Sequence, residues 1–122
     1  MIDNTNETRD DILDKDMIQP MIKLYTGLQS AAKDVADVIQ LHIDGQVTKD
    51  YLKCAYERYL NIYEFISSFA LTGLIPLGYF RNMFLQDIIN LFNDDKFYEQ
   101  IMDGYFPYLI EVQEKFILNG EE

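Results

Sequence analysis

The sequence predicts an all-α fold, a bundle of four to five helices with a central, mostly buried second helix at about residues 49–71. Apolar residues recur at spacings of three and four along most of the chain, which is the period of an amphipathic helix. β-branched residues are few in the most apolar segment, which argues against strands. A chain of 122 residues, of which 48% are hydrophobic and 25% charged, can bury one core without disulfides or metal ions.

Residues 1–16 are predicted to be an acidic tail, either partly disordered or containing a short helix that starts after Thr8. This segment has six acidic and two basic residues and few apolar groups to bury. It lacks the basic start and apolar stretch of a secretory signal, and the single Cys54 excludes an intramolecular disulfide. We therefore expect a cytoplasmic protein, with residues 17–120 forming a single helical-bundle domain.

The first helix of the bundle is expected to start near Pro20 and to end at Gly45. Proline suits the first turn, where its missing N–H costs nothing, and glycine suits the position just after a helix. Thr48 is then a suitable N-cap for the second helix. The apolar face of the first helix is predicted to contain Met21, Leu24, Leu28, Val35 and Ile39.

The second helix has a narrow polar stripe, and most of its remaining circumference is apolar, which is why it is predicted to be central. Asn61 and Glu64 belong to this stripe and are predicted to be structural. A buried polar group needs hydrogen-bond partners, so we expect them to cap free N–H groups where a neighbouring helix starts, near Leu74 to Leu77. The stripe consists of Lys53, Glu57, Asn61, Glu64 and Ser68.

The stretch Phe65 to Phe80, FISSFALTGLIPLGYF, carries no charge. It is too short for a membrane span, which needs roughly 20 apolar residues. Thr72 and Gly73 read as a helix end, and Pro76 as a helix start. The stretch is therefore predicted to be the buried corner between two core helices, and no membrane partner is expected.

The third helix is expected to follow Pro76, and Asn93 or Asp94 should break the chain and cap the next helix. The final segment keeps its apolar register through Gly104 and Pro107. We therefore expect either one kinked helix or two short helices almost in line. The two apolar stripes are Leu77, Phe80, Phe84, Ile88 and Leu91, and then Tyr98, Tyr105, Leu109, Val112 and Phe116.

The formal net charge is -11. Residues 1–16 have a net charge of -4, residues 17–92 of -1, and residues 93–122 of -6. Phosphate contacts require Lys and Arg, so this balance argues against direct binding of nucleic acid and of anionic membranes. The acidic final segment instead suits a basic surface on a partner protein.

No pattern of catalytic or metal-binding residues stands out. His42 and Cys54 could lie close together as a thiol–imidazole pair, but a polar histidine at a helix end and a buried, inert cysteine are the favoured interpretation. Zinc, di-iron and calcium sites each need ligand sets that this sequence lacks. We therefore predict a non-enzymatic protein with no catalytic residue, cofactor or metal.

The candidate partner-binding residues are acids and tyrosines of the final segment. Asp95, Glu99 and Asp103 recur every four residues and would share one helix face. Nine tyrosines are hard to bury in so small a core, so some should form contact surface. A solvated acidic face above a core of rings is the alternative. The full predicted set is Asp95, Tyr98, Glu99, Asp103, Tyr105, Tyr108, Glu111 and Glu114.

Residues 60–116 resemble a bacterial helical domain of unknown function. The resemblance is carried by LNIYEFISSFALTGLIPLGYFRNMF and FYEQIMDGYFPYLIEVQEKF. It implies an all-helical fold and no established chemistry. Members of that family often follow membrane helices, which this chain lacks. The matching residues are Asn61, Glu64, Gly73, Leu74, Ile75, Tyr98, Tyr108 and Leu109.

The favoured functional hypothesis is a small acidic protein-binding module, an adaptor or an inhibitor that acts by occupancy. Such a protein would suit a phage or mobile element whose target is the basic groove of a nucleic-acid-handling protein. One alternative is a bundle that binds an apolar small ligand between the second, third and last helices. Another is a homo-oligomer that pairs through an exposed aromatic face.

Overall fold

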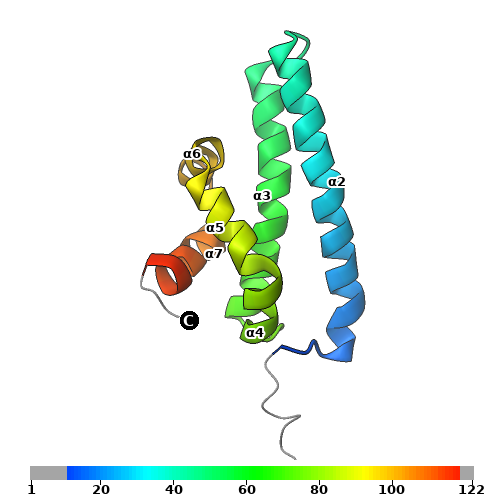
Figure 1. Cartoon of the computed structure of the whole chain (residues 1–122), viewed down its shortest axis with the longest axis vertical. Helices are drawn as coiled ribbons and strands as arrows, with labels where there is room; N and C mark the ends of the chain where they lie inside the picture. The colour runs from blue at the N-terminus through cyan, green and yellow to red at the C-terminus, as the bar shows by residue number, and fades with distance from the viewer. Residues whose placement is uncertain (1–10, 119–122) are drawn as a thin grey trace, which may run out of the picture.

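The computed structural model describes residues 11–118, and all regular elements within them are helical, which confirms the predicted fold class (Figure 1). Two long helices, α2 (Ile18–Ile43) and α3 (Lys49–Leu71), run side by side as a hairpin. The remaining helices pack on the other side of α3. The first ten residues of the predicted tail and the last two of the predicted domain lie outside the described residues.

Local signals set the ends of the hairpin helices. The chain enters α2 through a single 3₁₀ turn, η1 (Lys15–Met17), and residues 11–14 are not helical. Gly45 leaves α2 with φ of 76°, the left-handed conformation that glycine adopts without strain. Thr48 caps α3, since its hydroxyl oxygen accepts a hydrogen bond from the Tyr51 N–H at 3.1 Å. The predicted N-cap and the bounds of the second helix are confirmed.

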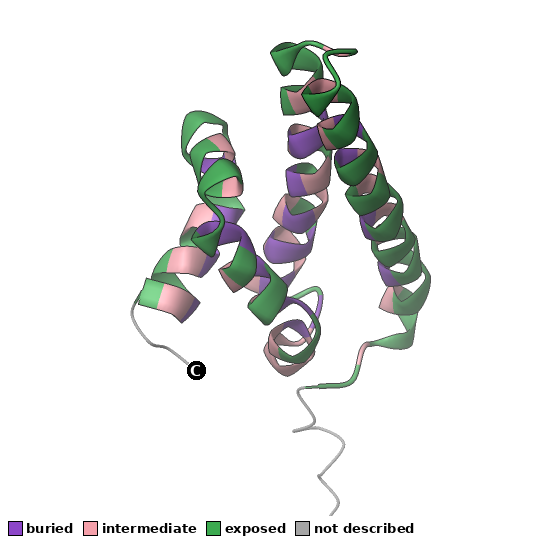
Figure 2. Cartoon of the chain, turned by 45° about the horizontal axis from the view of Figure 1, so that its top comes forward, coloured by how far each residue is buried: buried purple, intermediate pink, exposed green. Residues whose placement is uncertain are grey.

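Helix α3 is the central element, because it contacts both α2 and the helices of the C-terminal half. The side of α3 seen in Figure 2 is mostly buried or intermediate below the first turns. The exposed positions of the rest of the helix fall on one strip of its surface. The strip includes Cys54, Arg58, Asn61 and Phe65. The buried residues of α3 are Ala55, Tyr56, Leu60, Tyr63, Ile66, Ser67 and Ala70.

The corner after α3 is built as the sequence predicted, but it is only partly buried. Gly73 has φ of 85°, and the Leu74 N–H donates a hydrogen bond to the Phe69 carbonyl at 2.8 Å. Ile75 is 1% exposed, whereas Leu74 is 52% exposed. The prediction that the whole uncharged stretch is buried was therefore wrong at Thr72, Gly73 and Leu74 and, as described below, at Phe65. Among residues 11–118, no helix is both long and apolar enough to cross a bilayer.

The third helix is bent, because α4 (Leu77–Phe80) and α5 (Gln86–Asn93) are joined by a π-helical turn, η2 (Arg81–Leu85). The predicted apolar stripe still faces the core. Phe80, Phe84 and Ile88 are at most 1% exposed and contribute to the main hydrophobic cluster. Together with α6 and α7, the third helix therefore packs on the side of α3 that α2 leaves open.

The final segment forms two helices, α6 (Asp95–Asp103) and α7 (Pro107–Val112), and α7 continues into a π-helical turn, η3 (Gln113–Leu118). Asp94 caps α6: its Oδ1 accepts hydrogen bonds from the N–H groups of Lys96 at 2.9 Å and Phe97 at 3.3 Å. The chain between α6 and α7 is not helical. The structure has two short helices, as in the second predicted alternative, but the register of the apolar stripe is not kept between them.

Candidate protein-binding surface

The link between α6 and α7 determines which aromatic rings face solvent. Phe106 folds into the core and is 5% exposed. A Cβ atom on Gly104 would lie 2.6 Å from the Phe106 ring and 3.0 Å from the Gln100 carbonyl oxygen, so a larger residue would push the ring away. With Phe106 turned inward, Tyr105 points outward and is 86% exposed. The sequence had placed Tyr105 on the apolar stripe, and that assignment was wrong because Phe106 takes the buried position.

Glu64 of α3 fixes the start of α7. Its carboxylate oxygens accept hydrogen bonds from the N–H groups of Tyr108 and Leu109, both at 2.9 Å. These N–H groups belong to the first turn of α7, where the residue before the helix, Phe106, offers no side-chain acceptor. The predicted capping role of Glu64 is confirmed, but the capped helix is α7 and not the corner near Leu74 to Leu77. The pair of bonds joins two distant parts of the chain.

Asn61 does not share this role. It lies on the exposed strip of α3, one turn from Glu64, and is exposed to solvent. A structural role as a cap was predicted for a buried Asn61, and Asn61 is not buried. The reason is that α7 packs on the Glu64 side of the strip.

A hollow of about 560 Å³ lies between α3 and the start of α7. Three exposed rings meet there, from Phe65, Tyr105 and Tyr108, with exposed fractions of 58%, 86% and 38%. We call these three residues the aromatic surface. The hollow is lined by Glu64, Phe65, Ser68, Tyr105, Pro107, Tyr108 and Glu111. It therefore combines two predicted tyrosines and one predicted acid with a ring that the sequence had placed elsewhere.

Phe65 was missed because it belongs to an uncharged stretch that was expected to be buried. Its position on α3 held a signal: it lies four residues after Asn61 and three before Ser68, both members of the polar stripe. Residues at these spacings share one helix face. Phe65 consequently lies on the exposed strip, beside the hollow.

The acidic row of α6 has a different environment. Glu99 and Asp103 line a second hollow, of about 490 Å³, between α3 and α6. Three lysines line the same hollow, and two of them, Lys49 and Lys53, come from the first turns of α3. Glu99 and Asp103 therefore lie in a hollow that the chain's own lysines also line, and their role in partner binding stays a prediction.

The other predicted residues are exposed but do not extend the row. Asp95 and Tyr98 lie on the solvent side of α6, and Glu114 lies on η3. The break between α6 and α7 separates Glu111 and Glu114 from the α6 acids, because the chain between the two helices is not helical. Of the eight predicted partner-binding residues, the structure brings Tyr105, Tyr108 and Glu111 together in one hollow.

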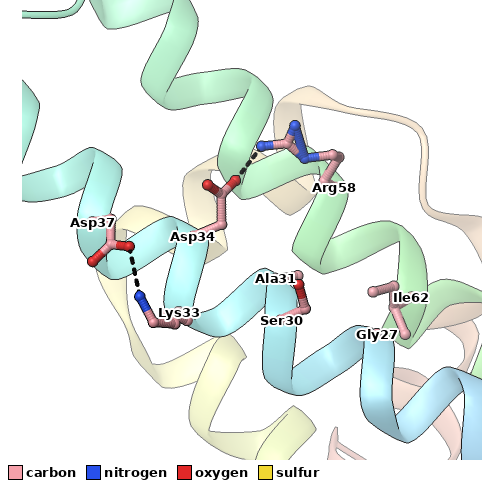
Figure 3. A pocket seen from close by; sticks show the side chains of 8 residues that line it. All are labelled: Gly27, Ser30, Ala31, Lys33, Asp34, Asp37, Arg58 and Ile62. Atoms are coloured by element: carbon pink, nitrogen blue, oxygen red, sulfur yellow. Dashed lines mark hydrogen bonds and ion pairs between the residues drawn. The ribbon is translucent and has the colours of Figure 1, made fainter.

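Another hollow, of about 630 Å³, lies between α2 and α3 (Figure 3). Its charged side chains form ion pairs with one another. Arg58 bonds to Asp34 across the two helices, and Lys33 bonds to Asp37 at 3.1 Å along α2. The hollow therefore offers a partner few unpaired charges.

The two residues considered for chemistry belong to different helices. His42 lies at the end of α2, with its Nδ1 3.3 Å from the Val47 carbonyl oxygen, and Cys54 lies on the exposed strip of α3. Cys54 had been expected to be buried, and that was wrong because the outer side of α3 is uncovered there. Within residues 11–118, no three His, Cys, Asp or Glu side chains gather as a metal site would require.

Comparisons with protein-family models, with curated proteins and with solved structures find no match for this chain. The resemblance of residues 60–116 to a bacterial helical domain therefore stays a prediction.

Proposed function

We propose that this chain is a non-enzymatic protein-binding module, and that the aromatic surface of Phe65, Tyr105 and Tyr108 is the centre of its interface. The observation that carries the proposal is the gathering of three exposed rings in one hollow, on a backbone that Glu64 holds in place. Tyrosine and other aromatic side chains are enriched among the residues that contribute most to protein interfaces. They supply large contact areas at a low cost in conformational entropy.

The charge around the aromatic surface favours a basic partner. Glu64 and Glu111 line the hollow, and none of its described lining residues is a lysine or arginine. The whole chain has a formal net charge of -11, so a second copy would be repelled by the same field. A partner face with an apolar centre and a rim of Lys or Arg complements this surface in both respects.

By binding to a basic face of a partner protein, this chain could act as an adaptor or as an inhibitor without any catalysis. A basic groove that normally holds nucleic acid is one surface of this type, and a bound acidic module would exclude the nucleic acid from it. Electrostatic steering raises the rate of such an encounter and makes it sensitive to salt. We expect the association rate to fall steeply as salt is added, while the dissociation rate depends mainly on the three rings.

The test starts from a random peptide display library that is panned on the full chain. We expect the enriched peptides to combine Lys or Arg with aliphatic or aromatic residues. A synthetic enriched peptide should lose about 30-fold in affinity on Tyr105→Ala or Phe65→Ala, the change expected when a central interface ring is truncated. Both side chains are largely exposed, so these variants should fold normally.

The matched control is Tyr51→Ala, which removes a tyrosine that is 55% exposed at the far end of α3. It should leave peptide affinity unchanged. Reversal of charge at Glu111 should weaken binding more than the same reversal at Glu99, which faces the lysines of the other hollow. Enriched peptides without basic residues, or equal binding to the Tyr105 and Tyr51 variants, would contradict the proposal.

The same variants also test a natural partner. A protein captured from cells of the native host should be purified and its affinity measured with each variant. Competition with a nucleic acid for that protein would support the inhibitor form of the proposal. Capture that Tyr105→Ala and Phe65→Ala do not affect would count against the aromatic surface.

A further inference from the structure

A third hollow lies on residues that the proposed interface does not use. It has a volume of about 290 Å³ and lies between α3, α5 and the turn into α6. Pockets for drug-sized ligands are usually larger, so this one suits a small group or a single side chain. It is lined by Tyr59, Tyr63, Asp87, Asn90, Leu91, Asp94 and Phe97.

Aromatic rings from two helices form its walls. The ring centroids of Tyr59 and Phe97 are 5.6 Å apart at an interplanar angle of 51°, and those of Tyr59 and Tyr63 are 5.3 Å apart at 89°. Tyr63 is 3% exposed, and its hydroxyl oxygen lies 3.5 Å from that of Tyr59. The walls therefore present both π-faces and hydroxyl oxygens, which attract cations.

Two carboxylates from different elements complete the lining. Asp94 is held in place because its Oδ1 accepts hydrogen bonds from two backbone N–H groups at the start of α6. Its Oδ2 takes no part in these two bonds. Asp87 comes from the first turn of α5. Burial raises the pKa of Tyr63, and the neighbouring Tyr59 and the charge of Asp87 raise it further. The pKa of Tyr56 is also raised, mainly by burial and to a smaller extent by the negative charge of Asp94. The charge of Asp94 therefore also acts on a neighbouring tyrosine.

This hollow shares with the hollow beside the aromatic surface a lining without lysine or arginine, and this separates both from the other two hollows. Arg58 and Lys33 line the hollow between α2 and α3, and three lysines line the hollow between α3 and α6. None of the described residues that line this third hollow is a lysine or an arginine. The carboxylates of Asp87 and Asp94 face the hollow without a basic group in its lining.

We propose that this hollow binds an alkylammonium group, with Asp87 and Asp94 pairing its charge and the rings of Tyr59 and Phe97 packing on its alkyl chain. Two carboxylates and two hydroxyls supply acceptors for the three N–H donors of an ammonium. In the part of the chain that the structure describes, no three His, Cys, Asp or Glu side chains gather as a metal site would require, which favours an ammonium over a hard metal ion here. The group could come from a free amine or from a lysine side chain of a protein.

The test titrates pentylamine and pentanol into the full chain and follows the backbone amide resonances by NMR. Both probes have the same alkyl chain, but only the amine is charged at neutral pH. We expect pentylamine to shift the amides of Asn90 and Phe97 and to bind at least about tenfold more tightly than pentanol, because it makes charge-assisted hydrogen bonds. Equal affinities, or shifts confined to other parts of the chain, would overturn the proposal.

Matched variants separate the hollow from the general negative field of the chain. Asp87→Asn and Asp94→Asn each remove one charge, and asparagine remains a good N-cap at position 94. Each should weaken pentylamine binding about tenfold. Asp95→Asn removes an adjacent charge that is exposed, like those of Asp87 and Asp94, but does not line the hollow, so it should change affinity less than about twofold. Equal effects of the three variants would show attraction by net charge only.

Two further probes identify the source of the ammonium. Tighter binding of cadaverine than of Nα-acetyl-lysine amide would indicate a free diamine, and the reverse would indicate a lysine of a protein. Binding of neither would overturn the proposal. The aromatic surface is not part of this site, so Tyr105→Ala should leave pentylamine binding unchanged, and failure of one proposal does not imply failure of the other.

Discussion

The α2–α3 hairpin and the α6–α7 segment of this chain are both helical, but different forces determine their structure. The hairpin is defined by local signals at Gly45 and Thr48, each of which acts on its own helix. The α6–α7 segment depends on contacts with distant residues, chiefly the bonds from Glu64 to the start of α7. Regular helices can thus be anticipated from short-range chemistry, whereas a broken segment takes its shape from what it packs against.

The largest expected effect on stability follows from removing the Phe106 ring, which is buried in the core at the link between α6 and α7. Phe106→Ala should lower the free energy of unfolding by about 3–5 kcal/mol, because it removes a ring that is 5% exposed in the main core. The neighbouring Tyr105→Ala is the control and should cost less than about 0.5 kcal/mol, since that ring is 86% exposed. Chemical denaturation measures both. Similar losses of stability from Phe106→Ala and Tyr105→Ala would mean that the Phe106 ring does not hold the link between α6 and α7 in place.

The next largest effect compares the long-range cap of α7 by Glu64 with the local cap of α3 by Thr48. Glu64→Ala should lower stability by about 1–2 kcal/mol, because two N–H groups of α7 lose their acceptor. Hydrogen exchange of the Tyr108 and Leu109 amides should become faster, while the amides of α2 keep their protection. Thr48→Ala is the matched local cap and should act on the first turn of α3 only. Unchanged exchange in α7 after Glu64→Ala would contradict the assigned role.

A smaller effect is confined to alkaline solution. Burial, aided by Tyr59 and Asp87, raises the pKa of Tyr63 above the ordinary value of 10.0, so the fold favours the neutral hydroxyl. Stability should therefore be at its full value below pH 10.0 and should fall as the pH rises further, because the unfolded chain releases this proton more readily.

Tyr63→Phe should reduce the fall in stability over that alkaline range, as measured by urea denaturation at several pH values. Tyr25→Phe changes an exposed tyrosine of α2 and is the control, which should follow the wild-type curve. An identical pH profile for the Tyr63 variant would show that this hydroxyl is not responsible.

The smallest effect concerns the surface of the hairpin. Lys33→Ala breaks the pair with Asp37, whose side chains are 79% and 61% exposed. We expect a loss of less than about 0.5 kcal/mol, because solvent and salt screen such pairs. Thermal denaturation at low and high salt measures it. A loss comparable to that of Glu64→Ala would mean that surface pairing stabilises the hairpin as much as the long-range cap stabilises α7.

The sequence by itself determined the all-α class, the bounds of α3, the left-handed glycines at the helix ends and the capping acids. Each depends on a few neighbouring residues, so a short window of sequence contains the necessary information. Glu64 is instructive because its role as a cap could be predicted, whereas its target could not. Identifying the target requires knowing which helix packs beside that side of α3.

Only the tertiary structure decided which side chains face outward. Phe65 and Tyr105 are exposed because α7 covers the Glu64 side of α3 and because Phe106 takes the buried position in the link. Glu99 and Asp103 share a hollow with Lys49 and Lys53, which precede them by more than forty residues in the chain. Exposure and charge pairing are properties of the packed arrangement, and helical periodicity fixes only the relative directions of side chains within one helix.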